Sequence, residues 1–102
     1  MKEYDLFIPL YYNDGTPIEV NKFQDLQQRL LAHFDGLTFF PQPNEGYWKM
    51  AGVLYKDEIV IYRVLSSKAR AARKYLAGLK SHLKKEFAQE EILIVERNVA
   101  TL

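Results

Sequence analysis

Apolar and polar positions along the chain predict six elements in the order strand, helix, strand, strand, helix, strand. The strands are expected over residues 3–12, 37–40, 53–65 and 92–95, and the helices over 22–35 and 68–87. This order is that of a ferredoxin-like sandwich, in which an antiparallel four-stranded sheet carries two helices on one face. We therefore expect an α+β fold and a single domain over residues 1–102.

The apolar periodicity is clearest in the second helix, where apolar residues recur three and four positions apart. They are Ala69, Ala72, Leu76, Leu79, Leu83 and Phe87. Such a narrow stripe indicates one buried face, and Ser66 or Ser67 is the expected cap. Asn21 and Gln24 predict a capping box at the start of the first helix.

Residues 41–52 interrupt the strand pattern. Pro41 and Pro43 cannot donate hydrogen bonds to a central sheet ladder, so the strand over 37–40 is expected to end there. Extended chain resumes over 47–50, and Ala51-Gly52 is a plausible hairpin turn. We therefore expect a long loop over 41–52 beside the sheet.

One face of the sheet has no helix over it in this fold. The residues expected to point toward the helices are Leu6, Ile8, Ile59 and Ile61. The open face would then carry Phe7, Tyr11, Val60, Tyr62 and Val64. An exposed apolar patch of that size is uncommon on a soluble monomer. We therefore expect a homodimer packed through the open sheet face, as in dimeric α/β-barrel proteins; the alternative is that the 41–52 loop covers it.

Six residues are candidates for a pocket or interface. They are Phe7, Tyr11, Trp48, Glu58, Tyr62 and Arg63. Trp48 would give a flat apolar wall with one donor, and Glu58 could bind a cation or act as a base if its pKa rose. The alternative is that Trp48 anchors the core or the dimer and that Glu58 only holds the loop.

No complete catalytic, metal or cofactor motif is present. The chain has no cysteine, and its two histidines lack a metal-ligand spacing. The serine-nucleophile and phosphate-loop patterns are also missing, so no catalytic residue, metal or cofactor is assigned. We expect a cytoplasmic binding or structural module, since no apolar run could span a membrane. The alternative is a cofactor-independent enzyme or small-ligand binder with a pocket between the open sheet face and the 41–52 loop.

Positive charge is concentrated in the second helix. Seven of the 14 basic residues lie within 68–87, which carries +6 while the remaining chain carries −5. RNA binding through this helix is a third possibility, because the element order is also that of the RNA-recognition motif. However, the third strand begins with the acidic run 56–58 and lacks that motif's glycines, so the sequence disfavours nucleic acid as a partner.

Scattered residues resemble an uncharacterised family of small bacterial proteins. The resemblance lies in Gly36-Leu37-Thr38, Gly46-x-Trp48, Glu58 and Phe87-x-Gln89-Glu90, and the segment 11–15 and Phe23 fit its early part. That family is of unknown function and looks ferredoxin-like. The resemblance implies the same fold and marks Trp48, Glu58 and Gln89 for testing, but it implies no activity.

Overall fold

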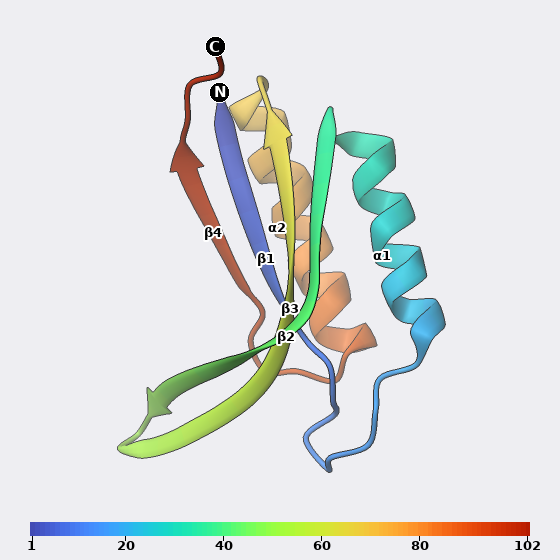
Figure 1. Cartoon of the computed structure of the whole chain (residues 1–102), viewed down its shortest axis with the longest axis vertical. Helices are drawn as coiled ribbons and strands as arrows, with labels where there is room; N and C mark the ends of the chain where they lie inside the picture. The colour runs from blue at the N-terminus through green and yellow to red at the C-terminus, as the bar shows by residue number, and fades with distance from the viewer.

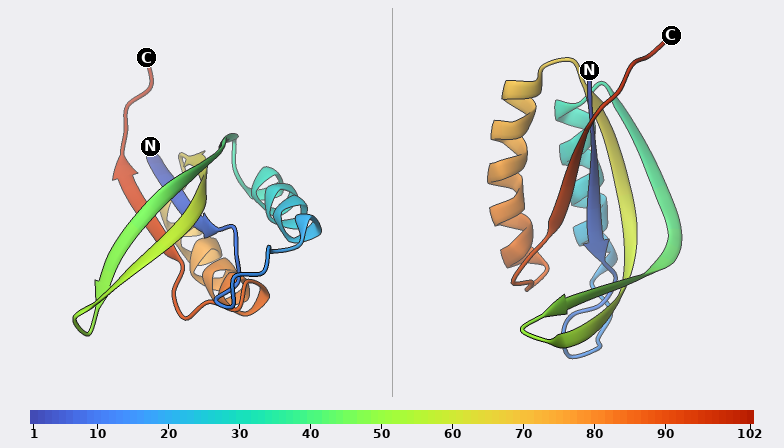
Figure 2. Two further views of the ribbon diagram at one scale, coloured as in Figure 1. Left: turned by 60° about the horizontal axis from the view of Figure 1, so that its bottom comes forward. Right: turned by 90° about the vertical axis from the view of Figure 1, so that its left-hand side faces the viewer.

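The computed structural model describes residues 1–102 and contains the six elements in the expected order (Figure 1). The strands are β1 (Lys2–Pro9), β2 (Gly36–Met50), β3 (Val53–Ser66) and β4 (Leu93–Asn98), and the helices are α1 (Val20–His33) and α2 (Ala69–Glu86). All neighbouring strands are antiparallel, in the order β2-β3-β1-β4. Both helices lie on one face of this sheet (Figure 2). The predicted ferredoxin-like sandwich is confirmed.

The core lies between the sheet and the two helices. The predicted stripe of α2 is buried from Ala72 through Leu83, and Phe87, directly after the helix, is buried as well. Helix α1 contributes Leu26 and Leu30 to this core; they are four positions apart and so lie on the same face of the helix. Neither helix has the predicted side-chain cap, because α1 begins at Val20, before Asn21, and the cap position of α2 is Lys68.

The faces of β3 are the reverse of those predicted. Val60, Tyr62 and Val64 are buried against the helices, whereas Ile59 and Ile61 lie on the open face with Phe7. Both files of β3 are apolar, so apolar character alone could not decide between them. Arg63 is in phase with Ile59 and Ile61, and a charged side chain in that file belongs on the face that reaches water. Tyr62, which was placed on the open face, is 1% exposed in the core.

Strands β2 and β3 form a hairpin that extends well beyond β1 and β4. Its register shifts between Phe40 and Asn44, at Pro41 and Pro43, and such an irregularity bends a sheet. The part beyond the bend, residues 44–58, is called the arm below; it passes beneath the lower ends of β1 and β4 (Figure 2). The loop expected over 41–52 is therefore continuous strand, apart from the predicted turn at Ala51-Gly52, where φ is 52° and 79°.

Candidate binding cavity on the open sheet face

A cavity of about 450 Å³ lies between the arm and the lower end of the open sheet face. Its sheet side is apolar and consists of Phe7, Pro9, Ile59, Ile61 and Leu93. The remaining lining residues come from the arm and from the segment before β4: Asn44, Glu45, Gly46, Tyr47, Trp48, Asp57, Gln89 and Glu91. The cavity thus has an apolar floor and a rim that mixes aromatic and acidic groups.

Trp48 is held in position within the arm. Its indole Nε1–H donates to Asp57 Oδ2 at 2.9 Å, and its ring centroid lies 5.7 Å from that of Tyr55. Trp48 pairs with Tyr55 across the hairpin, and Gly46 pairs with Asp57, so these residues share one face of the arm. An indole held in this way presents a flat apolar surface to an aromatic ligand.

Carboxylates around the rim are held in their ionised form. The Tyr47 hydroxyl donates to Glu45 at 2.8 Å and, with Lys56, lowers the pKa of that carboxyl. Lys80 lies 2.9 Å from Glu91 and is the main cause of the lowered pKa of Glu91. Both carboxylates therefore remain anionic at neutral pH. Glu45 pairs with Glu58 across the arm and lies on the face away from Trp48, so Glu91 is the one placed to accept hydrogen bonds from ligand hydroxyls or amines.

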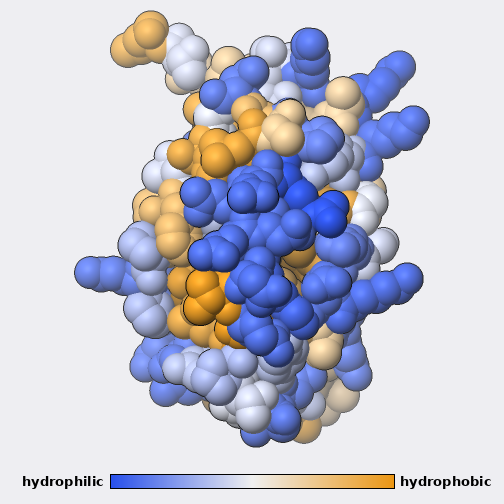
Figure 3. All heavy atoms as spheres, turned by 90° about the vertical axis from the view of Figure 1, so that its right-hand side faces the viewer, coloured by the Kyte–Doolittle hydropathy of each residue, from blue (hydrophilic) through white to orange (hydrophobic).

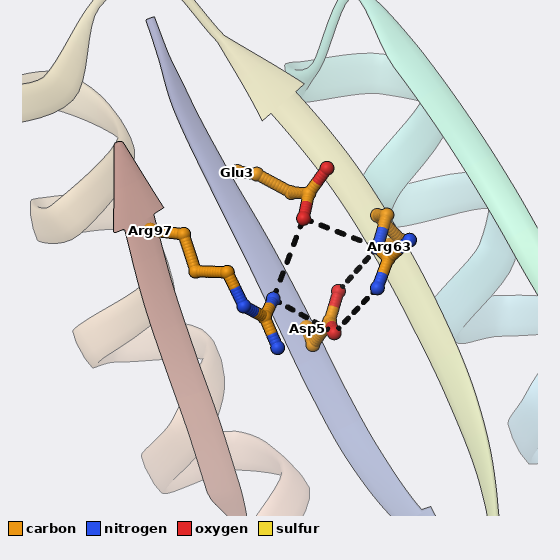
Figure 4. Close-up of polar contacts among 4 residues, drawn as sticks. All are labelled: Glu3, Asp5, Arg63 and Arg97. Carbon is orange, nitrogen blue, oxygen red and sulfur yellow. Dashed lines mark hydrogen bonds and ion pairs between the residues drawn. The ribbon is translucent and has the colours of Figure 1, made fainter. Parts of the chain in front are cut away.

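A network of four charged residues lies on the open face of the sheet (Figure 4). Two of them, Asp5 and Arg63, are each two positions along their strands from the cavity-floor residues Phe7 and Ile61. Asp5, which is 2% exposed, accepts hydrogen bonds from Arg63 Nε at 2.8 Å and Nη2 at 3.0 Å, and from Arg97 Nη1 at 2.9 Å. Glu3 lies 3.4 Å from both guanidinium groups. Hydrogen bonds from Arg63, and then from Arg97, keep the pKa of Asp5 below its ordinary value although burial opposes this.

The six residues singled out from the sequence do not form one site. Phe7 and Trp48 line the cavity, and Arg63 lies two positions along β3 from the lining residue Ile61. Tyr62 points into the core beneath the helices, and Tyr11 is exposed, forms an isolated β-bridge with Pro17 and does not line the cavity.

Glu58 does not line the cavity, whereas Asp57 and Gln89 do. Glu58 pairs with Glu45 one position out of phase with Asp57, so its side chain projects from the other face of the arm. The alternation along β3 could have shown this, because Asp57 is in phase with Ile59 and Ile61 once the open face is assigned correctly. Asp5 shares the file of Phe7, which was assigned to the open face correctly, but it was not singled out; Arg97 lies beyond the fourth strand as predicted over 92–95, whereas β4 extends to Asn98.

The rest of the surface offers fewer signs of a site. No three His, Cys, Asp or Glu side chains are grouped so as to hold a metal ion, and no helix is long and apolar enough to cross a membrane. On α2, Arg73 pairs with Glu96 at 2.6 Å and Lys80 with Glu91, so part of the basic charge is neutralised within the chain. The face viewed from the α1 side is largely hydrophilic (Figure 3).

No protein-family model and no curated protein sequence matches this chain, so the resemblance to a bacterial family stays a prediction. Among solved structures, the chain is similar to a phage SAM lyase in complex with S-methyl-5'-thioadenosine. The similarity has a TM-score of 0.66 at 15% sequence identity and covers 94% of this chain and 79% of the lyase chain. At this identity the similarity supports the fold alone.

Proposed function

We propose that this protein binds a small ligand of the thionucleoside class in the cavity between the arm and the open sheet face. The observation that carries the proposal is the cavity itself, with an apolar floor at Phe7 and Ile61, an indole wall at Trp48 and an anionic acceptor at Glu91 on the rim. Its volume of about 450 Å³ lies within the usual range for small-molecule sites.

The chemistry of the lining fits the parts of such a ligand. A purine can stack on Trp48, a ribose can donate hydrogen bonds to Glu91, and a thioether can lie on Phe7 and Leu93. The compound bound by the structurally similar phage lyase, S-methyl-5'-thioadenosine, has these three parts. That similarity supports the choice of ligand class.

Isothermal titration calorimetry with S-methyl-5'-thioadenosine tests this proposal. Trp48→Ala should weaken binding by about 10–100-fold, since stacking of one base on an aromatic ring is worth about 1–3 kcal/mol. Leu54→Ala is the matched control, because Leu54 lies on the same arm, is exposed and does not line the cavity. Failure of the wild-type protein to bind, or equal losses in both variants, would contradict the proposal.

The same cavity could also serve a cofactor-independent enzyme, the alternative that the similar phage lyase favours. Incubation with SAM, followed by chromatography, separates the two functions. Appearance of S-methyl-5'-thioadenosine above the rate without protein would show cleavage of SAM, whereas saturable binding without product would show a binding protein.

Self-association is a second property supported by an exposed surface. The exposed apolar residues of the arm are Tyr47, Trp48, Met50, Val53, Leu54 and Tyr55. The open face itself is less apolar than predicted, because Arg63, Arg97 and Glu3 occupy its upper part. We therefore propose that the protein forms a homodimer that buries the arm. Val53→Glu should shift sedimentation toward the monomer, and a monomeric wild type at high concentration would contradict this proposal.

A further inference from the structure

We infer that the network of Glu3, Asp5, Arg63 and Arg97 binds the zwitterionic α-amino acid end of a ligand whose thionucleoside end occupies the cavity. This inference rests on the proposed function and assigns a second subsite next to it. The four residues are drawn in Figure 4.

The network and the cavity floor are continuous on the sheet. Asp5 is two positions from Phe7 on β1, and Arg63 is two positions from Ile61 on the neighbouring strand β3. Two positions along a strand amount to about 7 Å, and side chains two apart lie on the same face. A ligand therefore needs a flexible link of only a few bonds to reach from the cavity to the guanidinium groups.

The arginines retain hydrogen-bond donors that the protein does not use. Arg97 donates to Asp5 and Glu3 only through Nη1, so its Nε–H and Nη2 groups have no partner within the chain. Arg63 donates through Nε and Nη2, which leaves Nη1. The two side chains are 43% and 36% exposed, so these donors can reach a ligand carboxylate.

Acceptors for a ligand ammonium group lie beside those donors. Glu3 interacts with both arginines through Oε1, and its Oε2 forms no bond within the chain. Asp5 fixes both guanidinium groups, and its depressed pKa keeps it charged. A rigid arrangement of this kind lowers the entropy cost of binding.

The balance of charge selects the type of head group. Two carboxylates and two guanidinium groups sum to zero, so a phosphate or another simple anion meets repulsion from Glu3 and Asp5 as well as attraction. A zwitterion can place its carboxylate on the arginines and its ammonium on Glu3 at the same time. The network thus complements an α-amino acid better than a group of one charge.

Two ligands and one variant test this inference by calorimetry. S-Adenosyl-L-homocysteine carries the head group and S-methyl-5'-thioadenosine lacks it, so the wild type should bind the first at least about 10-fold more tightly, since a charge-assisted hydrogen bond contributes about 1.5–3 kcal/mol. Arg97→Gln should abolish that preference and leave S-methyl-5'-thioadenosine binding unchanged. Arg70→Gln, an exposed arginine on α2, is the matched control and should behave as wild type.

A second measurement needs no substitution, in case Arg97→Gln alters folding. The 5'-propylthio analogue of adenosine has the same link without charges, and it should bind wild type no better than S-methyl-5'-thioadenosine. Equal affinity for all three ligands, or an undiminished preference in Arg97→Gln, would overturn the inference and leave the proposed function standing. Absence of binding by any of them would overturn both.

Discussion

The buried carboxylate of Asp5 provides the sharpest test of how the open face is stabilised. Asp5→Asn keeps the size of the side chain but removes the charge and turns one acceptor into a donor that faces two guanidinium groups. Three hydrogen bonds from Arg63 and Arg97 converge on Asp5. Hydrogen bonds to charged groups are each worth about 1.5–3 kcal/mol, but the half-exposed arginines recover water when released. We expect a net loss of about 2–3 kcal/mol in the free energy of unfolding.

Urea denaturation at neutral pH measures this loss. Asp25→Asn is the matched control, because Asp25 pairs with Arg29 at 2.7 Å on the exposed surface of α1 and should cost no more than about 0.5 kcal/mol. The pKa of Asp5 is lowered in the folded state, so its contribution is present above its ordinary value of 3.8 and disappears as the pH falls through the folded value. The unfolding free energies of the wild type and of Asp5→Asn should therefore converge in acid. A difference between the wild type and Asp5→Asn below about 0.5 kcal/mol at neutral pH, or a difference that persists unchanged in acid, would refute the reasoning.

Two further predictions concern the helical layer and its link to β4. Leu79→Ala should lower the free energy of unfolding by about 2–5 kcal/mol because Leu79 is buried in the middle of the apolar stripe of α2. Leu31→Ala, at an exposed position of α1, should lower it little, and similar losses for the two variants in chemical denaturation would mean that the buried face of α2 is misassigned. Arg73, with Tyr4, lowers the pKa of Glu96 to about 2, so this carboxylate stabilises the fold above its ordinary 4.5 and the effect is lost as the pH falls toward 2. Melting temperatures from pH 5 to pH 2 should fall less steeply in Glu96→Gln, and parallel curves would exclude this role.

The helical elements could be predicted from the sequence because one face of each is apolar and the other polar. The stripe from Ala72 to Phe87 has a single possible buried face, and it is buried as expected. Strand β3 has two apolar files, so periodicity leaves its orientation open, and the choice made from Ile59 and Ile61 was wrong. Arg63, in phase with those isoleucines and opposite Asp5, carried the missing information.

The site was less predictable than the fold because it depends on a bend. Pro41 and Pro43 were taken to end a strand, but β2 continues past them with a register shift and sends the arm beneath the sheet. Only this bend places Trp48 and Asp57 of the arm beside Phe7 of β1 and Leu93 of β4, so that residues from distant parts of the sequence line one cavity. The direction of such a bend follows from packing that no local pattern shows.

The most direct test of the central claim uses the only tryptophan of the chain. Its indole N–H gives a single resonance in a nitrogen-15 correlation spectrum, and in the free protein this group donates to Asp57 on the wall of the cavity. Titration with S-methyl-5'-thioadenosine should shift that resonance in a saturable manner, together with the amide signals of Phe7, Gly46 and Leu93. An indole resonance that stays unshifted at saturating ligand, or shifts confined to the α2 surface, would contradict binding in this cavity.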